Sequence, residues 1–261
     1  MSGSAESKGE YKTILVTTKD KITKITLNRP HKKNALNFVM YREIQQALEE
    51  AAKDDCTLTA ITGCGDYFSS GNDLYDINKN MSEIQKTNGK FMRDFIRHFI
   101  DFPKPLIALV NGHAIGLGVT LLGLCDIVYA SDKAVFQTRF TQFGLCPEGG
   151  SSHTFPKIMG VAKANEMLIF NKKITAEEAC ARGLVSEVFS DSAFQGEVWT
   201  RLKAYANLPQ NSLAFSKQLI RNGEKEILHA AASRECDLLV KRCFTDEFLN
   251  NLKDFVRKSK L

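Results

Sequence analysis

NGHAIGLGVTLLGLCDIVYAS, residues 111–131, is the stretch that decides the fold. It overlaps the end of an apolar run, Leu106–Asn111, which is typical of a buried strand, and it opens with a turn that contains three glycines. The apolar segment Val119–Cys125 then predicts a helix, and Asp126–Ala130 predicts a second strand. A strand, a turn, a helix and a strand in this order indicate a βαβ unit with parallel strands and a right-handed crossover.

Strands and helices also alternate before this unit. Two β-rich runs near the start are separated by three polar residues, which predicts a hairpin. The first expected helix has its apolar residues on one face: Phe38, Tyr41, Ile44, Leu48 and Ala51. The expected elements are Thr13–Thr18, Ile22–Leu27, Phe38–Lys53, Leu58–Thr62 and Ile84–Phe102. Prolines at 103 and 105 end the last of these helices.

The strand pattern fades after about residue 150, and the remaining segments have helical character. The expected helices are Val161–Phe170, Ala176–Arg182, Ala193–Ala206, Ser212–Arg221, Glu226–Phe244 and Asp246–Lys258. The sequence therefore predicts an α/β core followed by a helical C-terminal region, without internal repeats or a low-complexity linker.

Composition excludes several classes of protein. The chain has 261 residues, 43% of them hydrophobic, and a net charge of +5. No Lys/Arg run is long enough for a nucleic-acid tail, and no apolar run reaches the roughly 18 residues of a membrane span. Seven scattered cysteines without CxxC spacing argue against a disulfide framework or a zinc site. The mild positive charge suits a substrate that carries several phosphates.

Two glycine-bearing turns are candidates for binding an oxygen atom. Phe68-Ser69-Ser70-Gly71-Asn72-Asp73-Leu74 and the turn around Gly116-Leu117-Gly118 each join a strand to a helix. Backbone N–H groups at such helix starts point outward, and two of them at one point would form an oxyanion hole. The first turn has an equally good structural explanation, in which Asp73 caps the following helix. The glycine spacing fits neither a Walker loop nor a dinucleotide fingerprint.

A carboxylate, Glu148, lies between Pro147 and the pair Gly149-Gly150. On an exposed loop this residue would be unremarkable. In an apolar cleft, burial would raise its pKa and make it a candidate general base.

Four blocks occur in order along the chain: Arg29-Pro30 with Asn34-Ala35-Leu36, FSSGNDL (68–74), NGHAIGLGVTLLGLCDIVYAS (111–131) and FGLCPEGGSS (143–152). Together they resemble the crotonase superfamily of enoyl-CoA hydratases and isomerases, from about Lys12 to the C-terminus. Within it, the chain is most similar to the peroxisomal Δ3,Δ2-enoyl-CoA isomerases. The resemblance implies an α/β fold with a crotonase-like ββα spiral core and a helical C-terminal region.

The resemblance also implies roles for individual residues. The two oxyanion N–H donors would belong to Ser70 and Leu117, and Glu148 would be the acid–base residue. Lys32 and Lys33 would meet the phosphates of coenzyme A. The remaining contacts with substrate or coenzyme A would come from Phe68, Ser69, Ser70, Gly71, Asn72, Asp73, Leu74, Gly116 and Phe140.

A departure from the hydratase pattern determines the expected reaction. The two catalytic glutamates of family hydratases correspond to Thr120 and Phe140, and neither side chain exchanges a proton with substrate. Hydration needs two such groups, whereas moving a double bond from C3–C4 to C2–C3 needs one carboxylate that serves both carbons. We therefore expect an isomerase of 3-enoyl-CoA in β-oxidation that requires no metal or redox cofactor. The alternatives are a non-catalytic module that binds coenzyme A or a protein, and another acyl-CoA reaction such as dienoyl-CoA isomerisation or thioester hydrolysis.

The chain ends at Ser259-Lys260-Leu261, which matches the address that the peroxisomal import receptor recognises, so we expect the peroxisome matrix. The resemblance further implies a homotrimer. The expected domains are 1–11, a disordered or appended N-terminus; 12–205, the core; 206–258, a helical trimerisation region; and 259–261, the targeting tail.

Overall fold

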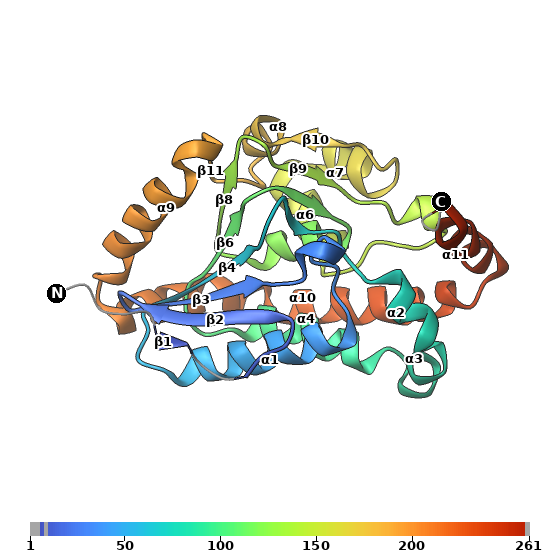
Figure 1. Cartoon of the computed structure of the whole chain (residues 1–261), viewed down its shortest axis with the longest axis horizontal. Coiled ribbons are helices and arrows are strands. Elements are labelled where there is room, and N and C mark those ends of the chain that lie inside the picture. Colours follow the sequence, from blue (N-terminus) through green and yellow to red (C-terminus); the bar gives the residue numbers. More distant parts are fainter. Residues whose placement is uncertain (1–5, 8–9, 259–261) are drawn as a thin grey trace.

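A computed structural model describes residues 6–7 and 10–258 and contains two β-sheets (Figure 1). The seven-stranded sheet has the order β1-β2-β3-β4-β6-β8-β11, and the four-stranded sheet has the order β10-β9-β7-β5. Their strands are β1 (Glu6–Ser7), β2 (Ile14–Lys19), β3 (Ile22–Leu27), β4 (Leu58–Gly63), β5 (Tyr67–Ser69), β6 (Leu106–Val110), β7 (His113–Ile115), β8 (Ile127–Ser131), β9 (Val135–Gln137), β10 (Ile174–Thr175) and β11 (Glu187–Phe189).

The chain alternates between the two sheets, and this alternation generates the spiral. Each of β4, β6 and β8 lies in the large sheet and is followed within a few residues by β5, β7 or β9 in the small sheet. A helical segment follows each pair before the chain returns to the large sheet. Strands β4, β6 and β8 are parallel neighbours, as are β5, β7 and β9. The predicted ββα spiral is therefore confirmed.

The hairpin of β2 and β3 is confirmed, with Lys19 paired to Ile22. Its two turn residues, Asp20 and Lys21, have φ values of 54° and 60°, which match the right-handed twist of the strands. Strand β6 is buried along its whole length. Helices cover both faces of this sheet, with α9 on one side and α1 and α4 on the other, which explains the continuous apolar run.

Several helices differ from those predicted. The helices are α1 (Phe38–Lys53), α2 (Leu74–Lys79), α3 (Met81–Thr87), α4 (Lys90–Asp101), α5 (Leu117–Thr120), α6 (Ser151–Met159), α7 (Val161–Leu168), α8 (Ala176–Ala181), α9 (Asp191–Ala206), α10 (Gln210–Cys243) and α11 (Asp246–Lys258). The helix expected over Ile84–Phe102 is divided because Asn88 and Gly89 both adopt left-handed conformations. The helix expected over Val119–Cys125 is instead α5 followed by a short 3-10 turn.

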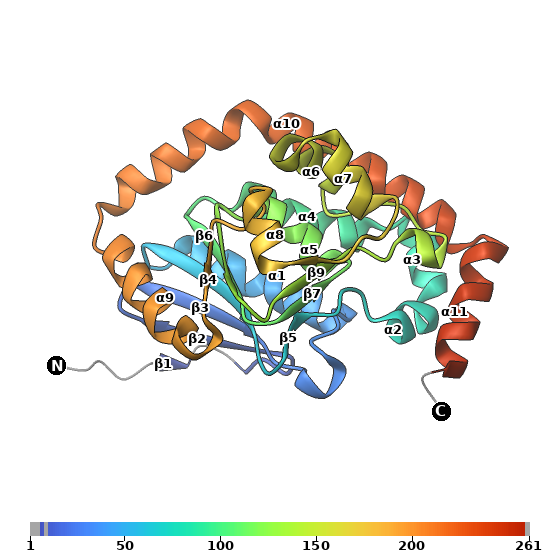
Figure 2. The same ribbon diagram turned by 90° about the horizontal axis from the view of Figure 1, so that it is seen from above.

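Helix α10 joins two helices that the sequence suggested were separate, and it spans the molecule (Figure 2). It packs against α4 and α6, so that its buried residues extend the main core. Helix α11 then turns back beside α2 and α3, where Phe248 and Leu252 are buried. Within the described residues, no helix is both long and apolar enough to cross a membrane. The targeting tail at 259–261 lies outside the described residues.

Candidate active site

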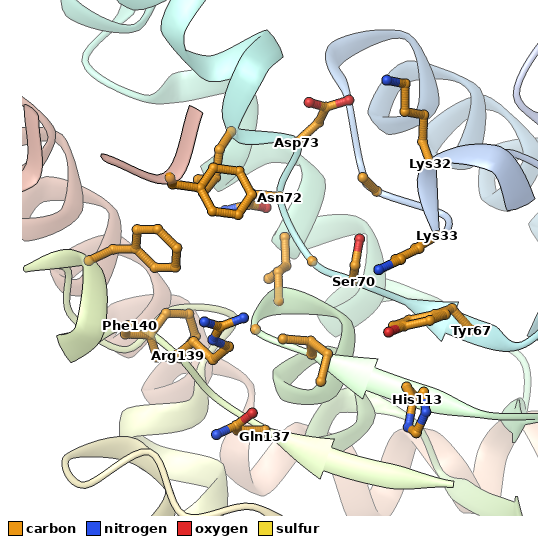
Figure 3. Close-up of a pocket in the computed structure, with 18 of the residues that line it drawn as sticks. Lys32, Lys33, Tyr67, Ser70, Asn72, Asp73, His113, Gln137, Arg139 and Phe140 are labelled. Atoms are coloured by element: carbon orange, nitrogen blue, oxygen red, sulfur yellow. The ribbon is translucent and has the colours of Figure 1, made fainter. Parts of the chain in front are cut away.

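A cavity of about 680 Å³ opens between the two glycine-bearing turns, the 3-10 turn at 30–32 and helix α11 (Figure 3). Basic side chains of Lys32, Lys33, Arg139 and Lys173 line it, together with polar atoms of the turns. Apolar side chains such as Phe140 line it as well. A pocket of this size with a few converging polar groups has the usual character of a small-molecule site.

The two glycine-bearing turns are in direct contact. A Cβ atom built on Gly71 would lie 2.7 Å from the carbonyl oxygen of Ile115 and 3.3 Å from the backbone nitrogen of Leu117. Gly71 also has a φ of +81°, which other residues rarely adopt. Only glycine therefore allows the first turn to approach the start of α5 this closely. The contact places residues 70–72 beside the start of α5, and residues of both turns line the cavity.

The hydrogen bonds of these turns distinguish the candidate donors from one another. The N–H of Ser70 donates to the carbonyl oxygen of Lys33 at 2.9 Å, and the N–H of Gly71 donates to Ser69 Oγ at 3.1 Å. Within the described part of the chain, the N–H groups of Asn72 and Leu117 have no acceptor. Ser70 lines the cavity, but its N–H is already used, which counts against the sequence-based assignment. Asn72 and Leu117 are the pair that the cavity leaves available.

Glu148 lines the cavity and is 2% exposed. The Asn72 side-chain nitrogen donates to its Oε1 at 3.0 Å and to its Oε2 at 3.2 Å. Burial raises the pKa of Glu148 to about 8; the Asn72 hydrogen bond opposes this shift, and the nearby charge of Glu235 adds to it. The pKa therefore lies in the range where a carboxyl group both takes up and releases a proton near neutral pH.

Helix α10 holds the loop that carries Glu148. The Glu235 carboxylate, 6% exposed, accepts hydrogen bonds from the N–H of Gly150 at 2.6 Å and from the N–H of Ser152 at 2.7 Å. It thereby caps the start of α6, where Gly150 has no side chain to do so. The Ser151 hydroxyl donates to the carbonyl oxygen of Glu148 at 2.7 Å. These bonds fix the backbone on both sides of the loop.

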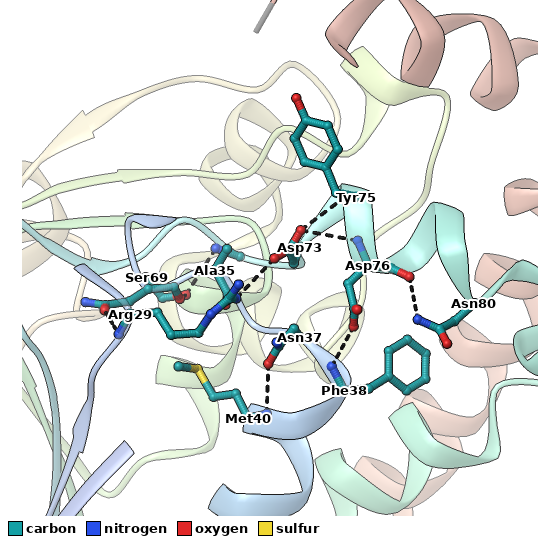
Figure 4. A network of polar contacts seen from close by, with 12 residues as sticks. Arg29, Ala35, Asn37, Phe38, Met40, Ser69, Asp73, Tyr75, Asp76 and Asn80 are labelled. Atoms are coloured by element: carbon teal, nitrogen blue, oxygen red, sulfur yellow. Dashed lines mark hydrogen bonds and ion pairs between the residues drawn. The ribbon is translucent and has the colours of Figure 1, made fainter. Parts of the chain in front are cut away.

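Asp73 is the other acidic residue that lines the cavity, and it is already engaged (Figure 4). It accepts hydrogen bonds from the N–H groups of Tyr75 and Asp76, as the capping interpretation predicts, and it pairs with Arg29 at 3.1 Å. Glu148 is therefore the lining carboxylate without a cationic partner among the described residues.

The other predicted residues fall into two groups. Leu74, Gly116 and Phe140 line the cavity, whereas Phe68 and Ser69 are buried beneath it and are absent from its lining. Thr120 is fully buried, and its hydroxyl donates to the carbonyl oxygen of Leu117. His113 also lines the cavity, and its ring packs against that of Tyr67 with 4.9 Å between the ring centroids.

Three functional neighbours escaped the sequence-based interpretation. Tyr41 was assigned to the apolar face of α1, and its hydroxyl donates to Asn72 Oδ1. Glu235 lies more than 80 residues from the loop that it holds. Phe255 on α11 lines the cavity and packs on Phe143 at 5.6 Å. No local pattern in the sequence marks these contacts, because each joins distant segments. Among the described residues, no cluster of His, Cys, Asp or Glu is arranged for a metal ion.

The fold and the cavity define a class of protein, and the comparison with family models agrees with it. Residues 17–261 match the model described as "Enoyl-CoA hydratase/isomerase". Solved structures support the assignment: an enoyl-CoA hydratase/isomerase from Pseudoalteromonas atlantica T6c has a TM-score of 0.87 at 34% identity, covering 95% of this chain and 98% of that one. The chain belongs to the enoyl-CoA hydratase/isomerase family.

Among characterised relatives, the chain is similar to proteins named enoyl-CoA delta isomerases. The chain is 57% identical over 256 residues to human "Enoyl-CoA delta isomerase 2", covering 96% of this chain and 65% of that protein. It is 51% identical to mouse "Enoyl-CoA delta isomerase 3, peroxisomal", covering 99% of this chain and 83% of that protein. It is also 43% identical to human "Chromodomain Y-like protein", covering 90% of this chain and 40% of that protein. The chain thus spans about two thirds of the human isomerase and less than half of the chromodomain protein.

Proposed function

We propose that the chain is an isomerase that converts 3-enoyl-CoA, cis or trans, into trans-2-enoyl-CoA. The observation that supports this most strongly is a buried carboxylate, Glu148, in the lining of a cavity. Asn72 and Leu117 line the same cavity, and their backbone N–H groups have no acceptor among the described residues. The similarity to two proteins named enoyl-CoA delta isomerases favours the same reaction.

Glu148 acts as a proton shuttle in this proposal. Its ionised carboxylate removes a proton from C2, and the electron pair of that C–H bond forms the new C2–C3 double bond through a dienolate. The carboxylic acid then returns the proton to C4, where the electron pair of the former C3–C4 double bond forms the new C–H bond and the thioester carbonyl and the carboxylate are restored. General acid–base transfer of this kind typically contributes about 10²- to 10⁴-fold to the rate.

The thioester oxygen collects negative charge while the proton is on Glu148. The N–H groups of Asn72 and Leu117 have no acceptor within the described residues and lie on adjoining turns, so they are the proposed oxyanion donors. Loss of one such donor typically costs about 3 kcal/mol of transition-state stabilisation.

The absence of a second acid separates this reaction from hydration. The positions that correspond to the hydratase glutamates hold Thr120, which is fully buried, and Phe140, which contributes an aromatic ring to the cavity wall. Asp73 is paired with Arg29. Among the described residues that line the cavity, no second carboxylate is therefore free to activate water.

The basic mouth of the cavity fits the phosphates of coenzyme A. Lys32, Lys33, Arg139 and Lys173 all line it, and Figure 3 shows Lys32 and Lys33 on the same side as Ser70. We place the phosphates at these side chains and the acyl group toward Glu148.

The test is a coupled assay of 3-enoyl-CoA conversion with wild type and Glu148→Gln. The amide is nearly isosteric but does not accept the C2 proton, so turnover should fall by about 10³-fold or more. Near-normal turnover of the variant would refute the assignment.

The second candidate is a non-catalytic module, favoured by the 43% identity to the chromodomain protein. It predicts tight binding of coenzyme A by calorimetry, with no conversion of 3-enoyl-CoA, 2-enoyl-CoA or dienoyl-CoA. Turnover that depends on Glu148 excludes it.

Two further proposals concern assembly and location. Helix α10 exposes Leu219 and Ile220, at 80% and 79%, beside Phe215, which suits a homotrimer interface. Sedimentation should give a trimer that Leu219→Glu dissociates.

We also propose import into the peroxisome matrix through the receptor for Ser259-Lys260-Leu261. A fluorescent fusion that lacks Leu261 should remain cytosolic.

A further inference from the structure

The hydroxyl group of Tyr41 lies on the opposite side of the Asn72 amide from Glu148. Tyr41 projects from α1, is 3% exposed, and donates a hydrogen bond to Asn72 Oδ1. The Asn72 nitrogen faces the other way and contacts both carboxylate oxygens of Glu148. We propose that Tyr41 is a positioning residue that acts through the Asn72 side chain to orient the Glu148 carboxylate. This inference rests on the proposed isomerase function.

The orientation of the amide is the quantity that Tyr41 determines. A phenol that donates to Oδ1 leaves the amide nitrogen to face Glu148. If the amide were turned by 180°, its oxygen would face the carboxylate, and two acceptors would be opposed without a proton between them. The Tyr41 hydroxyl therefore selects the one amide orientation that supports an ionised base.

The position of the Tyr41 hydroxyl is itself fixed by packing. The ring lies 4.5 Å from that of Phe95 and 5.8 Å from that of Phe91, both in edge-on arrangements. Burial raises the pKa of Tyr41 well above 10, so the hydroxyl keeps its proton throughout the range of an enzyme assay. Tyr41 is thus a neutral, immobile donor.

The geometry suits a carboxylate that serves two carbon atoms. One amide nitrogen lies within hydrogen-bond distance of both Oε1 and Oε2 of Glu148, so the carboxylate keeps this contact whichever oxygen holds the proton. The backbone N–H of the same residue, Asn72, is one of the two proposed oxyanion donors. Asn72 would therefore contact the base through its side chain and the thioester through its backbone. Tyr41 would keep the side-chain amide in the orientation that faces Glu148.

Few groups near Glu148 change charge in the neutral range. Glu235 from α10 is a titratable group that raises the pKa of Glu148. The charge of Glu148 in turn raises the pKa values of Tyr41 from α1, Cys146 from its own loop, and Cys236 and Cys243 from α10. Burial raises the pKa of each of the three thiols to about 12, so they stay neutral. Glu235 is the one other carboxyl group of this set, and it is common to every variant below.

The test is a double-mutant cycle with Tyr41→Phe and Asn72→Ala. Each change removes one side-chain partner of the Tyr41–Asn72–Glu148 relay and keeps the backbone N–H of residue 72. Asn72→Ala removes a hydrogen bond to the charged Glu148 carboxylate, and Tyr41→Phe weakens the same bond by releasing the amide that donates it. Each single variant should therefore lower kcat by about 10-fold and move the acid limb of the kcat/KM profile to higher pH. If Tyr41 acts through Asn72, the double variant should resemble Asn72→Ala alone.

A matched control is Tyr129→Phe. Tyr129 is equally buried at 3% and shares a hydrogen bond of 3.0 Å with Tyr205, but it lies in the separate core beneath α9. This variant should keep the wild-type kcat and pH profile. Circular dichroism and thermal unfolding of each variant identify any effect of misfolding.

Two outcomes overturn the inference while the isomerase function stands: an unchanged pH profile in Tyr41→Phe, or a roughly 100-fold loss in the double variant from independent effects. A wild type that does not convert 3-enoyl-CoA refutes the proposed function instead. The pKa of Glu148 is then still measurable by carboxyl ¹³C NMR, assigned by Glu148→Gln. Tyr41→Phe should raise that pKa, and an unaltered value contradicts the relay without any activity measurement.

Discussion

The contact between the two glycine-bearing turns makes Gly71→Ala an informative substitution. The new methyl group would lie 2.7 Å from the Ile115 carbonyl oxygen and 3.3 Å from the Leu117 nitrogen, and both are backbone atoms that cannot rotate away. The φ of +81° adds about 1 to 2 kcal/mol of strain for a residue with a Cβ. To relieve the overlap, the turns must separate, which moves the Asn72 N–H away from the Leu117 N–H.

Gly183→Ala is the matched control for backbone strain. Its φ of +82° is almost the same, but the nearest atom to its new methyl group lies at 3.5 Å, an ordinary contact. Gly183 is not among the residues that line the cavity. Gly183→Ala should therefore lose about 1 to 2 kcal/mol of stability and keep full activity.

Gly71→Ala should lose more stability than this control and, in addition, about 100-fold in kcat/KM, which corresponds to one displaced oxyanion donor. Urea unfolding measures the first quantity, and the 3-enoyl-CoA assay measures the second. If Gly71→Ala matched Gly183→Ala in both stability and activity, the close approach of the turns would not form the oxyanion site.

Three further predictions follow from the site. In wild type, kcat/KM should rise with pH to a plateau above about 8, because burial raises the pKa of Glu148 and the free enzyme needs the ionised base; a profile flat from pH 6 to 9 contradicts this. Glu235→Gln removes a charge that raises the pKa of Glu148, so the acid limb should move to lower pH. The amide keeps one acceptor for the N–H groups of Gly150 and Ser152, whereas Glu235→Ala removes both and should cost more in urea unfolding, about 1 to 3 kcal/mol for each N–H left without an acceptor. Arg29→Ala leaves Asp73 without its cation and should raise KM for acyl-CoA more than it changes kcat, since the pair supports the α2 side of the cavity; an unchanged KM would show that α2 needs no such support.

Local sequence predicted much of the architecture correctly. The β2–β3 hairpin, α1, α9, α11 and the parallel strands β4, β6 and β8 all correspond to expected segments, because residues of alternating or helical periodicity bury one face wherever they pack. Two predictions of helix boundaries were wrong: one expected helix is divided, and two expected helices are joined. Asn88 and Gly89 interrupt an apolar periodicity that continues through them, and α10 continues through residues 222–225, where the apolar pattern weakens. Within 222–225, Glu224 pairs with His153 and Lys157 of α6, and Lys225 pairs with Asp101 of α4. These contacts join segments that are distant in the sequence, so no local pattern predicts them.

The sequence by itself determined the family, the glycine turns and the single acid–base candidate, because these depend on residue types within four short blocks. Only the tertiary structure decided which N–H groups are free. Ser70 and Asn72 lie two positions apart in one turn, and the difference between them is that the Lys33 carbonyl, from another segment, accepts the Ser70 N–H. The environment of Glu148 was decided in the same way. Tyr41, Asn72 and Glu235 come from three separate segments, and their hydrogen bonds exist only where the fold brings those segments together around one buried carboxylate.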